Sequence, residues 1–129
     1  MIVEVFSLCD AATSDGGKLN ILGSFDVIRV QKLPAVLAHC SIAIRLRFFA
    51  LEKGDHHIEV RFIDADGQGI IPPSAGSVKV DFSSEQRSAA FNLVLNIPGL
   101  KIDKAGEYAL ELRVAGQVVI SLPLDVRLQ

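Results

Sequence analysis

The sequence predicts an all-β fold: an antiparallel β-sandwich of about seven or eight strands, immunoglobulin-like in architecture. Two observations support it. Apolar and polar residues alternate with period two in many short segments, and turn-forming residues separate these segments at short intervals. No segment between them is convincingly helical, so parallel βαβ units are excluded and we expect antiparallel pairing throughout. A closed β-barrel is the alternative that the strand count leaves open.

The clearest alternation runs from residue 106 to 128. On either side of a turn at Ala115-Gly116, apolar residues take every second position. Because successive side chains of a strand point to opposite faces, this segment predicts a long antiparallel hairpin with one buried face. The apolar row comprises Tyr108, Leu110, Leu112, Val114, Val118, Ile120, Leu122, Leu124 and Val126.

The first third of the chain predicts one strand at 2–12, a turn at 13–17 and a second strand at 18–30. Gly23 interrupts the second strand, and an isolated glycine in a strand often marks a bulge or bend. Residues 31–39 are compatible with either a helical turn or an extended crossover.

The middle of the chain predicts a central strand at 40–51, with Ile42, Ile44, Leu46 and Phe48 on one face. A polar turn at 52–57 then leads to a strand at 58–62, and we expect these two strands to form a second hairpin.

A turn follows at 64–67, and Pro72-Pro73 ends the segment after it, because proline cannot donate to a ladder. Two further strands are predicted at 78–82 and 89–97, the second ended by Pro98-Gly99.

Length and charge exclude several functional classes. We expect residues 1–129 to form one β-sandwich domain. The net charge is −2 and basic residues are scattered singly, which argues against nucleic acid as a partner. No apolar run approaches the roughly 20 residues that span a bilayer, so no membrane partner is expected. Glu4 interrupts the first residues where an export signal would be apolar, which predicts a cytoplasmic protein with reduced cysteines.

One motif predicts a structural role. Gly106-Glu107-Tyr108 opens the long hairpin and contains the only tyrosine. In immunoglobulin-like sandwiches, a tyrosine at such a corner bonds through its hydroxyl to the backbone a few residues upstream. We therefore interpret Gly106 and Tyr108 as structural residues, together with Gly23.

Possible metal ligands are present, but their spacing is unfavourable. Asp64 and Asp66 precede a glycine as in a calcium loop, yet the twelfth position is Ala75 instead of glutamate. His56 and His57 fall in the polar turn predicted at 52–57, where we expect both side chains to be solvated, and no Cys-x-x-Cys or His-x-x-x-His pair exists in the chain. These four are weak candidates only, and we expect no metal, no cofactor and no catalytic residue.

The segments Gly17–Phe25 (GKLNILGSF) and Gly106-Glu107-Tyr108 resemble a bacterial family of small β-sandwich proteins of unknown function. In that family a glycine–lysine turn leads into a strand ending Leu-Gly-x-Phe, and a Gly-x-Tyr hairpin closes the domain. The resemblance covers nearly the whole chain. It implies a bacterial source and supplies no activity, ligand or site residue.

The sequence favours a non-catalytic module for protein–protein interaction or structure, because no group of polar residues converges in the pattern. The alternative is a sandwich that binds a small ligand or metal ion through its loops at 13–17, 52–57 and 64–67. An enzyme is not expected. The strand at 78–82 lies between two irregular connections, as an edge strand would, and predicts a homodimer or larger assembly through this strand or the face beside it.

Overall fold

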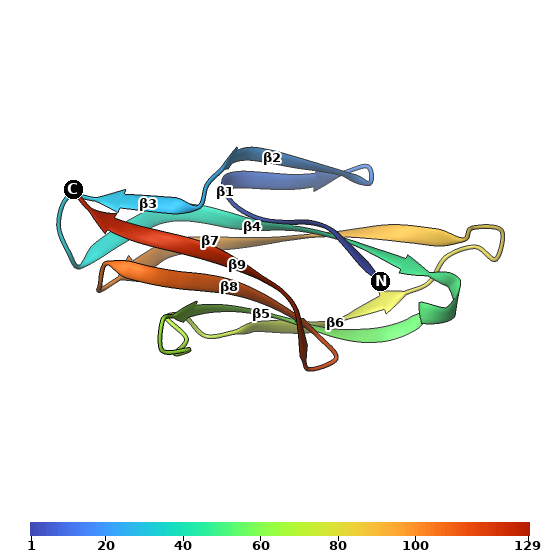
Figure 1. Cartoon of the computed structure of the whole chain (residues 1–129). Coiled ribbons are helices and arrows are strands. Elements are labelled where there is room, and N and C mark those ends of the chain that lie inside the picture. Colours follow the sequence, from blue (N-terminus) through green and yellow to red (C-terminus); the bar gives the residue numbers. More distant parts are fainter.

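Two open sheets stack on each other in the computed structural model, which describes residues 1–129 (Figure 1). The first sheet has the order β2-β1-β4-β7. It comprises β1 (Ile2–Asp15), β2 (Lys18–Ser24), β4 (Ala35–Phe49) and β7 (Ser88–Ile102). The second sheet has the order β3-β9-β8-β5-β6. It comprises β3 (Val27–Val30), β5 (Gly54–Asp64), β6 (Ser74–Val80), β8 (Gly106–Val114) and β9 (Gln117–Leu128).

The predicted β-sandwich is confirmed, with nine strands instead of seven or eight. Each sheet ends in two edge strands, so the closed barrel is not formed. The strand predicted at 78–82 is β6, an edge strand as expected, although it begins at Ser74 and ends at Val80.

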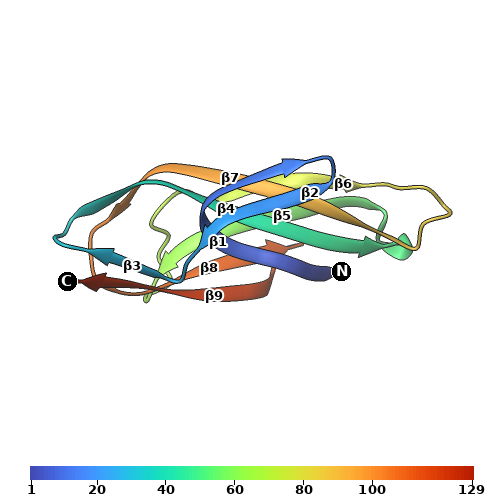
Figure 2. The same ribbon diagram turned by 90° about the horizontal axis from the view of Figure 1, so that it is seen from above.

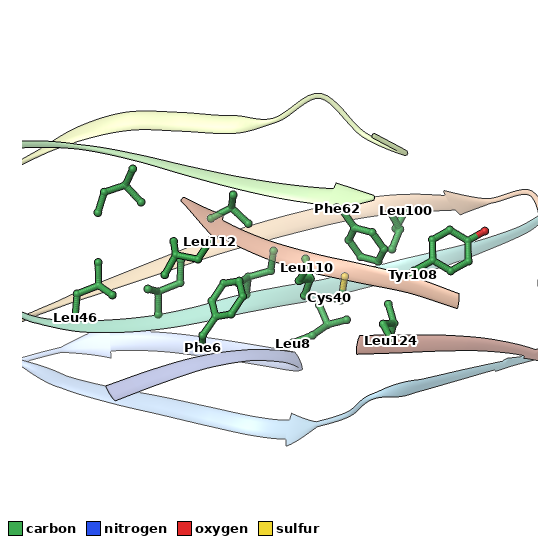
Figure 3. Close-up of a cluster of buried hydrophobic side chains, with 14 of the residues drawn as sticks. Phe6, Leu8, Cys40, Leu46, Phe62, Leu100, Tyr108, Leu110, Leu112 and Leu124 are labelled. Atoms are coloured by element: carbon green, nitrogen blue, oxygen red, sulfur yellow. The ribbon is translucent and has the colours of Figure 1, made fainter. Parts of the chain in front are cut away.

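The core lies between the sheets and is built from the apolar rows that the alternation indicated. Figure 3 shows part of it, with side chains from both sheets meeting between the ribbons. Burying one such side chain stabilises the fold by about 1.5–3 kcal/mol relative to leaving it in water. The cluster contains Phe6, Leu8, Ile28, Cys40, Ile42, Ile44, Leu46, Phe48, Ile58, Val60, Phe62, Val80, Leu100, Ile102, Tyr108, Leu110, Leu112, Leu124 and Val126.

β1 bends back on itself, which the sequence did not indicate. Its first half pairs with β4 and its second half pairs with β2, and Cys9 is the residue at which both pairings meet. Figures 1 and 2 show the resulting β1–β2 hairpin lying over the outer face of the first sheet, across β4 and β7. Arg45 of β4 fastens its tip, since Nη1 donates to the Gly17 carbonyl oxygen at 3.2 Å.

The strand expected at 18–30 is divided between the two sheets. β2 ends at Ser24 in the first sheet, and β3 starts at Val27 on the edge of the second. β3 runs parallel to β9, from Val27 beside Asp125 to Val30 beside Leu128. The expectation of purely antiparallel pairing is therefore wrong. The parallel pair needs no helical crossover because β4 to β8 themselves form the connection between its strands.

Residues 40–51 and 58–62 do not form a hairpin. β4 belongs to the first sheet and β5 to the second, and the short 3-10 turn Ala50–Glu52 carries the chain between them. β4 also begins earlier than expected, because the segment left open at 31–39 enters an extended strand at Ala35. The turn expected at 13–17 is shorter, since β1 continues to Asp15.

Pro98-Gly99 bends β7 without ending it. Gly99 has a φ of 64°, and the chain then returns to the ladder, where Leu100 pairs with Leu37. Leu100 and Ile102 are both buried. A proline is tolerated inside this strand because β7 is an edge strand, so its missing N–H lies on the side that has no partner.

Gly23 lies where β2 leaves the hairpin, and its backbone conformation favours glycine there. Its φ is 67°, and a Cβ atom at this position would in addition displace the exposed Asp10 carboxylate. We expect Gly23→Ala to lower the free energy of unfolding by about 1–3 kcal/mol in urea titrations, the range for a strained backbone position.

Gly76→Ala is the matched control for that substitution. A Cβ at Gly76, on the edge strand β6, meets no atom within 4 Å. Its free energy of unfolding should stay at or slightly above that of the unmodified protein, because a glycine inside a strand costs conformational entropy. Equal losses in the two variants would contradict the special role of Gly23.

Candidate functional site

A network of charged and polar side chains crosses three strands on the outer face of the first sheet. Glu4 lies at a bulge of β1 between Arg45 and Arg47 of β4. Its Oε1 accepts from Arg45 Nε at 2.9 Å, and its Oε2 accepts from Arg47 Nε at 2.7 Å. On the β7 side, Arg45 donates to Asn92 Oδ1 at 3.0 Å and Arg47 donates to Ser88 Oγ at 2.9 Å. Both guanidinium groups are thus engaged with neighbouring strands.

The pKa of the Glu4 carboxyl lies below its ordinary value of 4.5. The hydrogen bond from Arg47 is the largest cause, and Arg45 acts in the same direction. A carboxylate with a depressed pKa stabilises the folded state fully above the pKa of the unfolded chain, and this stabilisation is lost as the pH falls through the folded value.

Replacing Glu4 should therefore change how stability depends on pH. We expect Glu4→Gln to have a flatter profile than the unmodified protein below about pH 4.5 in urea midpoints measured from pH 6 to 3, because the paired carboxylate no longer titrates. Glu85→Gln serves as the control, since Glu85 forms no ion pair. Parallel profiles for Glu4→Gln and the unmodified protein would contradict this account.

A second polar chain on the same face joins a histidine, a serine and an asparagine. The Ser41 hydroxyl, which is fully buried, donates to Asn96 Oδ1 at 2.7 Å and lies 3.3 Å from His39 Nε2. A nucleophilic serine would direct its proton to the imidazole, but here the proton is committed to the amide oxygen. Ser41 and Asn96 face outward because they alternate with the inner rows of β4 and β7, and their contact follows from the register of these two strands.

The two cysteines are free and fully buried. Burial raises the pKa of the Cys40 thiol to about 11, so it is protonated near neutral pH. Cys9 lies on the opposite face of the sheet, where its thiol donates to the Ser41 carbonyl oxygen at 3.4 Å.

The weak metal candidates lie in separate places, and no three potential ligands gather anywhere in the chain. Asp64 Oδ1 accepts the backbone N–H groups of Asp66 at 3.0 Å and of Gln68 at 2.9 Å, so the carboxylate closes its own turn. His56 and His57 lie in β5 and not in the turn expected at 52–57. The His56 ring contacts Phe48 at 4.7 Å between centroids, while its Nε2 hydrogen-bonds to the Glu52 carbonyl oxygen.

Two of the loops proposed for a ligand site, at 52–57 and 64–67, do not lie close together. Figures 1 and 2 place the turn at 64–67 at the opposite end of the sandwich from the connection between β4 and β5. A site built from both loops would need them at one end.

Tyr108 forms the corner contact of a sandwich. Its hydroxyl donates to the Lys104 carbonyl oxygen at 2.7 Å, four residues upstream. The ring is buried and packs edge-on against Phe62, with 6.2 Å between centroids. Gly106 has a φ of 131°, a conformation that L side chains rarely adopt, which accounts for glycine at the entry to β8.

One side of the sandwich is incompletely closed, between the edge strands β6 and β7. A groove of about 190 Å³ lies there, with Leu93 and Leu95 on one wall and residues 74–78 of β6 on the other. At this point β6 turns Ser74 and Gly76 inward, opposite Val60 and Ile58, and such small residues do not cover the inner row of β7. That row therefore stays half-buried: Phe91, Leu93, Leu95 and Ile97.

A larger hollow, of about 430 Å³, lies on the other side, between the bend of β1 and β9. Phe6, Leu122 and Leu124 contribute to its apolar lining. The polar groups there are the side chains of Ser7 and Ser24, whose hydroxyls hydrogen-bond to each other, and of Asp26.

Residues 4–127 match the model of the DUF6941 family, described as a family of unknown function. No curated protein matches the sequence. Among solved structures, the chain is similar to the Pseudomonas fluorescens alkylpurine DNA glycosylase AlkC bound to DNA containing an abasic site analog, with a TM-score of 0.48 and 14% identity. That similarity covers 79% of this chain and 28% of the glycosylase chain, so the protein spans under a third of its length. The structure contains no helix with the length and hydrophobicity needed to cross a membrane.

Proposed function

Since the chain belongs to the DUF6941 family, whose function is unknown, we propose from its own geometry that it is a non-catalytic module that binds protein chains. The observation that carries the proposal is the open side between β6 and β7, where two edge strands flank an apolar groove. Edge strands expose unpaired N–H and C=O groups that can pair with another chain. The groove would receive alternate side chains of an added strand, which is how β-strand addition combines affinity with specificity.

The polar groups elsewhere support a non-catalytic role. The arginines of the outer face are engaged with Glu4, Asn92 and Ser88, and the Ser41 proton is committed to Asn96. A catalytic group must be free to exchange a proton or attack a substrate. The cytoplasmic location and the homodimer remain predictions, and the dimer is one form that such binding would take.

Two prolines can test the open side without breaking either sheet. The Ala115 N–H donates to the His57 carbonyl oxygen, so His57 directs its backbone groups toward β8. Because these groups alternate along a strand, Ile58 and Val60 point toward β6, where they meet Gly76 and Ser74. Ser77 therefore directs its N–H to the free edge, and proline there removes only an unpaired donor. The same alternation applies to β7. Arg87 directs its carbonyl oxygen toward β4, where it accepts the Ala50 N–H, so Val94, an odd number of residues further along, directs its N–H to the free edge of β7.

The double variant Ser77→Pro/Val94→Pro should lose every partner that uses this side. We expect the unmodified protein to bind a second copy or another protein, and the double variant to lose that species. Light scattering on a sizing column detects a second copy, and capture from source-cell extract by the immobilised protein detects another protein. Circular dichroism and melting temperature check that the variant is folded. A folded double variant that retains the same species as the unmodified protein would overturn the proposal.

A small-ligand site is the second candidate, favoured by the 430 Å³ hollow beside β9, a volume within the usual range of ligand pockets. A ligand with an apolar body and a hydroxyl or amine end would suit Phe6 together with Ser7, Ser24 and Asp26. Binding would raise the melting temperature in a screen of metals and metabolites. At a ligand concentration a hundredfold above Kd, the free energy of unfolding increases by about 2.7 kcal/mol. Leu122→Trp should fill the hollow and remove such a shift, and a screen without shifts counts against this candidate.

A further inference from the structure

The edges of the two sheets differ in their protection against pairing with another chain. β6 is seven residues long and presents Lys79. β3 is four residues long and presents Arg29, and the exposed half of β9 beside it contains Pro123. In β2 the positive φ of Gly23 bends the strand near its end. Short strands, charges, prolines and bends are the features by which native proteins prevent edge-to-edge association.

β7 has little such protection over most of its length. It is 15 residues long, and only Pro98-Gly99 near its end interrupts the edge. From Ser88 to Leu100 it has no charged side chain. Its inner row, Phe91 to Ile97, is half-buried because the small residues of β6 do not cover it. A long, uncharged edge with exposed apolar surface is otherwise an aggregation hazard, which indicates that a partner covers it.

The free hydrogen-bonding groups of β7 can be assigned to particular residues. The Ala50 N–H donates to the Arg87 carbonyl oxygen at 3.2 Å, so Arg87 directs its backbone groups toward β4. Backbone groups alternate in direction along a strand, so those of Ser88, Ala90, Asn92, Val94 and Asn96 face the free edge. The position of Pro98 agrees, because its missing N–H would also face outward.

We propose that the occupant of this edge is the β7 strand of a second copy, paired antiparallel across a two-fold axis near Leu93; the inference rests on the proposed function and names its partner. Leu93 is the middle of the straight part, before the bend at Pro98-Gly99. This register places Phe91 opposite Leu95 of the copy and Ala89 opposite Ile97. The two half-buried rows become one continuous apolar surface, and the outward-facing backbone groups of each strand pair with those of the other.

The absence of charge favours a second copy over an unrelated chain. A two-fold axis brings each residue near its own equivalent, so any charge close to the axis is repelled by itself. A different partner could neutralise a charge at the centre of this edge with an opposite one, whereas an edge that pairs with itself must be neutral close to its axis. Ser88 to Leu100 meets that condition, and the chain as a whole carries a net charge of only −2.

Single prolines distinguish β7 from β6. Val94→Pro removes a free N–H at the centre of the proposed contact, and Ser77→Pro removes one on the edge of β6 as the matched control. Light scattering at micromolar concentration should give twice the monomer mass of 13.9 kDa for the unmodified protein and for Ser77→Pro. Val94→Pro should give the monomer mass while keeping the far-UV spectrum of the unmodified protein.

A charge exchange tests the two-fold axis and does not depend on proline. Val94 lies next to the axis, so Val94→Lys and Val94→Glu should each be monomeric by self-repulsion. Mixed in equal amounts, they should form a mixed dimer, identified by native mass spectrometry.

The possible failures are distinguishable. Dimers of Val94→Pro, or dimers lost only in Ser77→Pro, would overturn self-pairing through β7 while the proposed interaction module stands. Self-pairing would also be overturned if the unmodified protein is monomeric and captures another protein that the double variant does not capture. Failure of the mixed Lys and Glu variants to associate would exclude the two-fold contact near residue 94.

Discussion

The burial of the inner row of β4 against β8 and β5 is the interaction on which the rest of the structure depends. Ile44, Leu46 and Phe48 on one side and Leu112 on the other are completely buried. Each substitution of such a residue by alanine removes both transfer free energy and packing. Because β4 and β8 are interior strands of their sheets, every other strand is positioned by pairing outward from one of them.

That arrangement leaves the two sides of the sandwich unequal. On the β9 side, the bend of β1 and the return of β3 bring chain segments close to the gap between the sheets, and β3 pairs with the end of β9. On the other side, β6 is short and consists largely of small residues beside the long strand β7. The uncovered apolar row of β7 follows from this difference in length and side-chain size, and so does the proposed interaction surface.

The outer face of the first sheet shows how polar groups are managed without a chemical site. The β1–β2 hairpin covers part of this face, and Glu4 with Arg45 and Arg47 ties β1 to β4. Exposed ion pairs contribute little individually, because solvent and salt screen them. Here they join β1 to β4 at the bulge of β1, because Glu4 accepts hydrogen bonds from both arginines at that point.

The sequence by itself determined the fold class, the faces of most strands and the edge position of β6, because alternation and turn composition are local properties. It also indicated Gly23 and the Gly106–Tyr108 corner, whose backbone demands are local. Only the tertiary structure decided that β4 and β5 lie in different sheets, that β3 runs parallel to β9, and that β1 folds back over β4. Strand order depends on which distant edges meet, and a period-two pattern carries no information about that. The groove beside β7 exists for the same reason: residues 74–78 and Leu93 with Leu95 are 15 to 21 positions apart in sequence and become neighbours only when the two sheets stack.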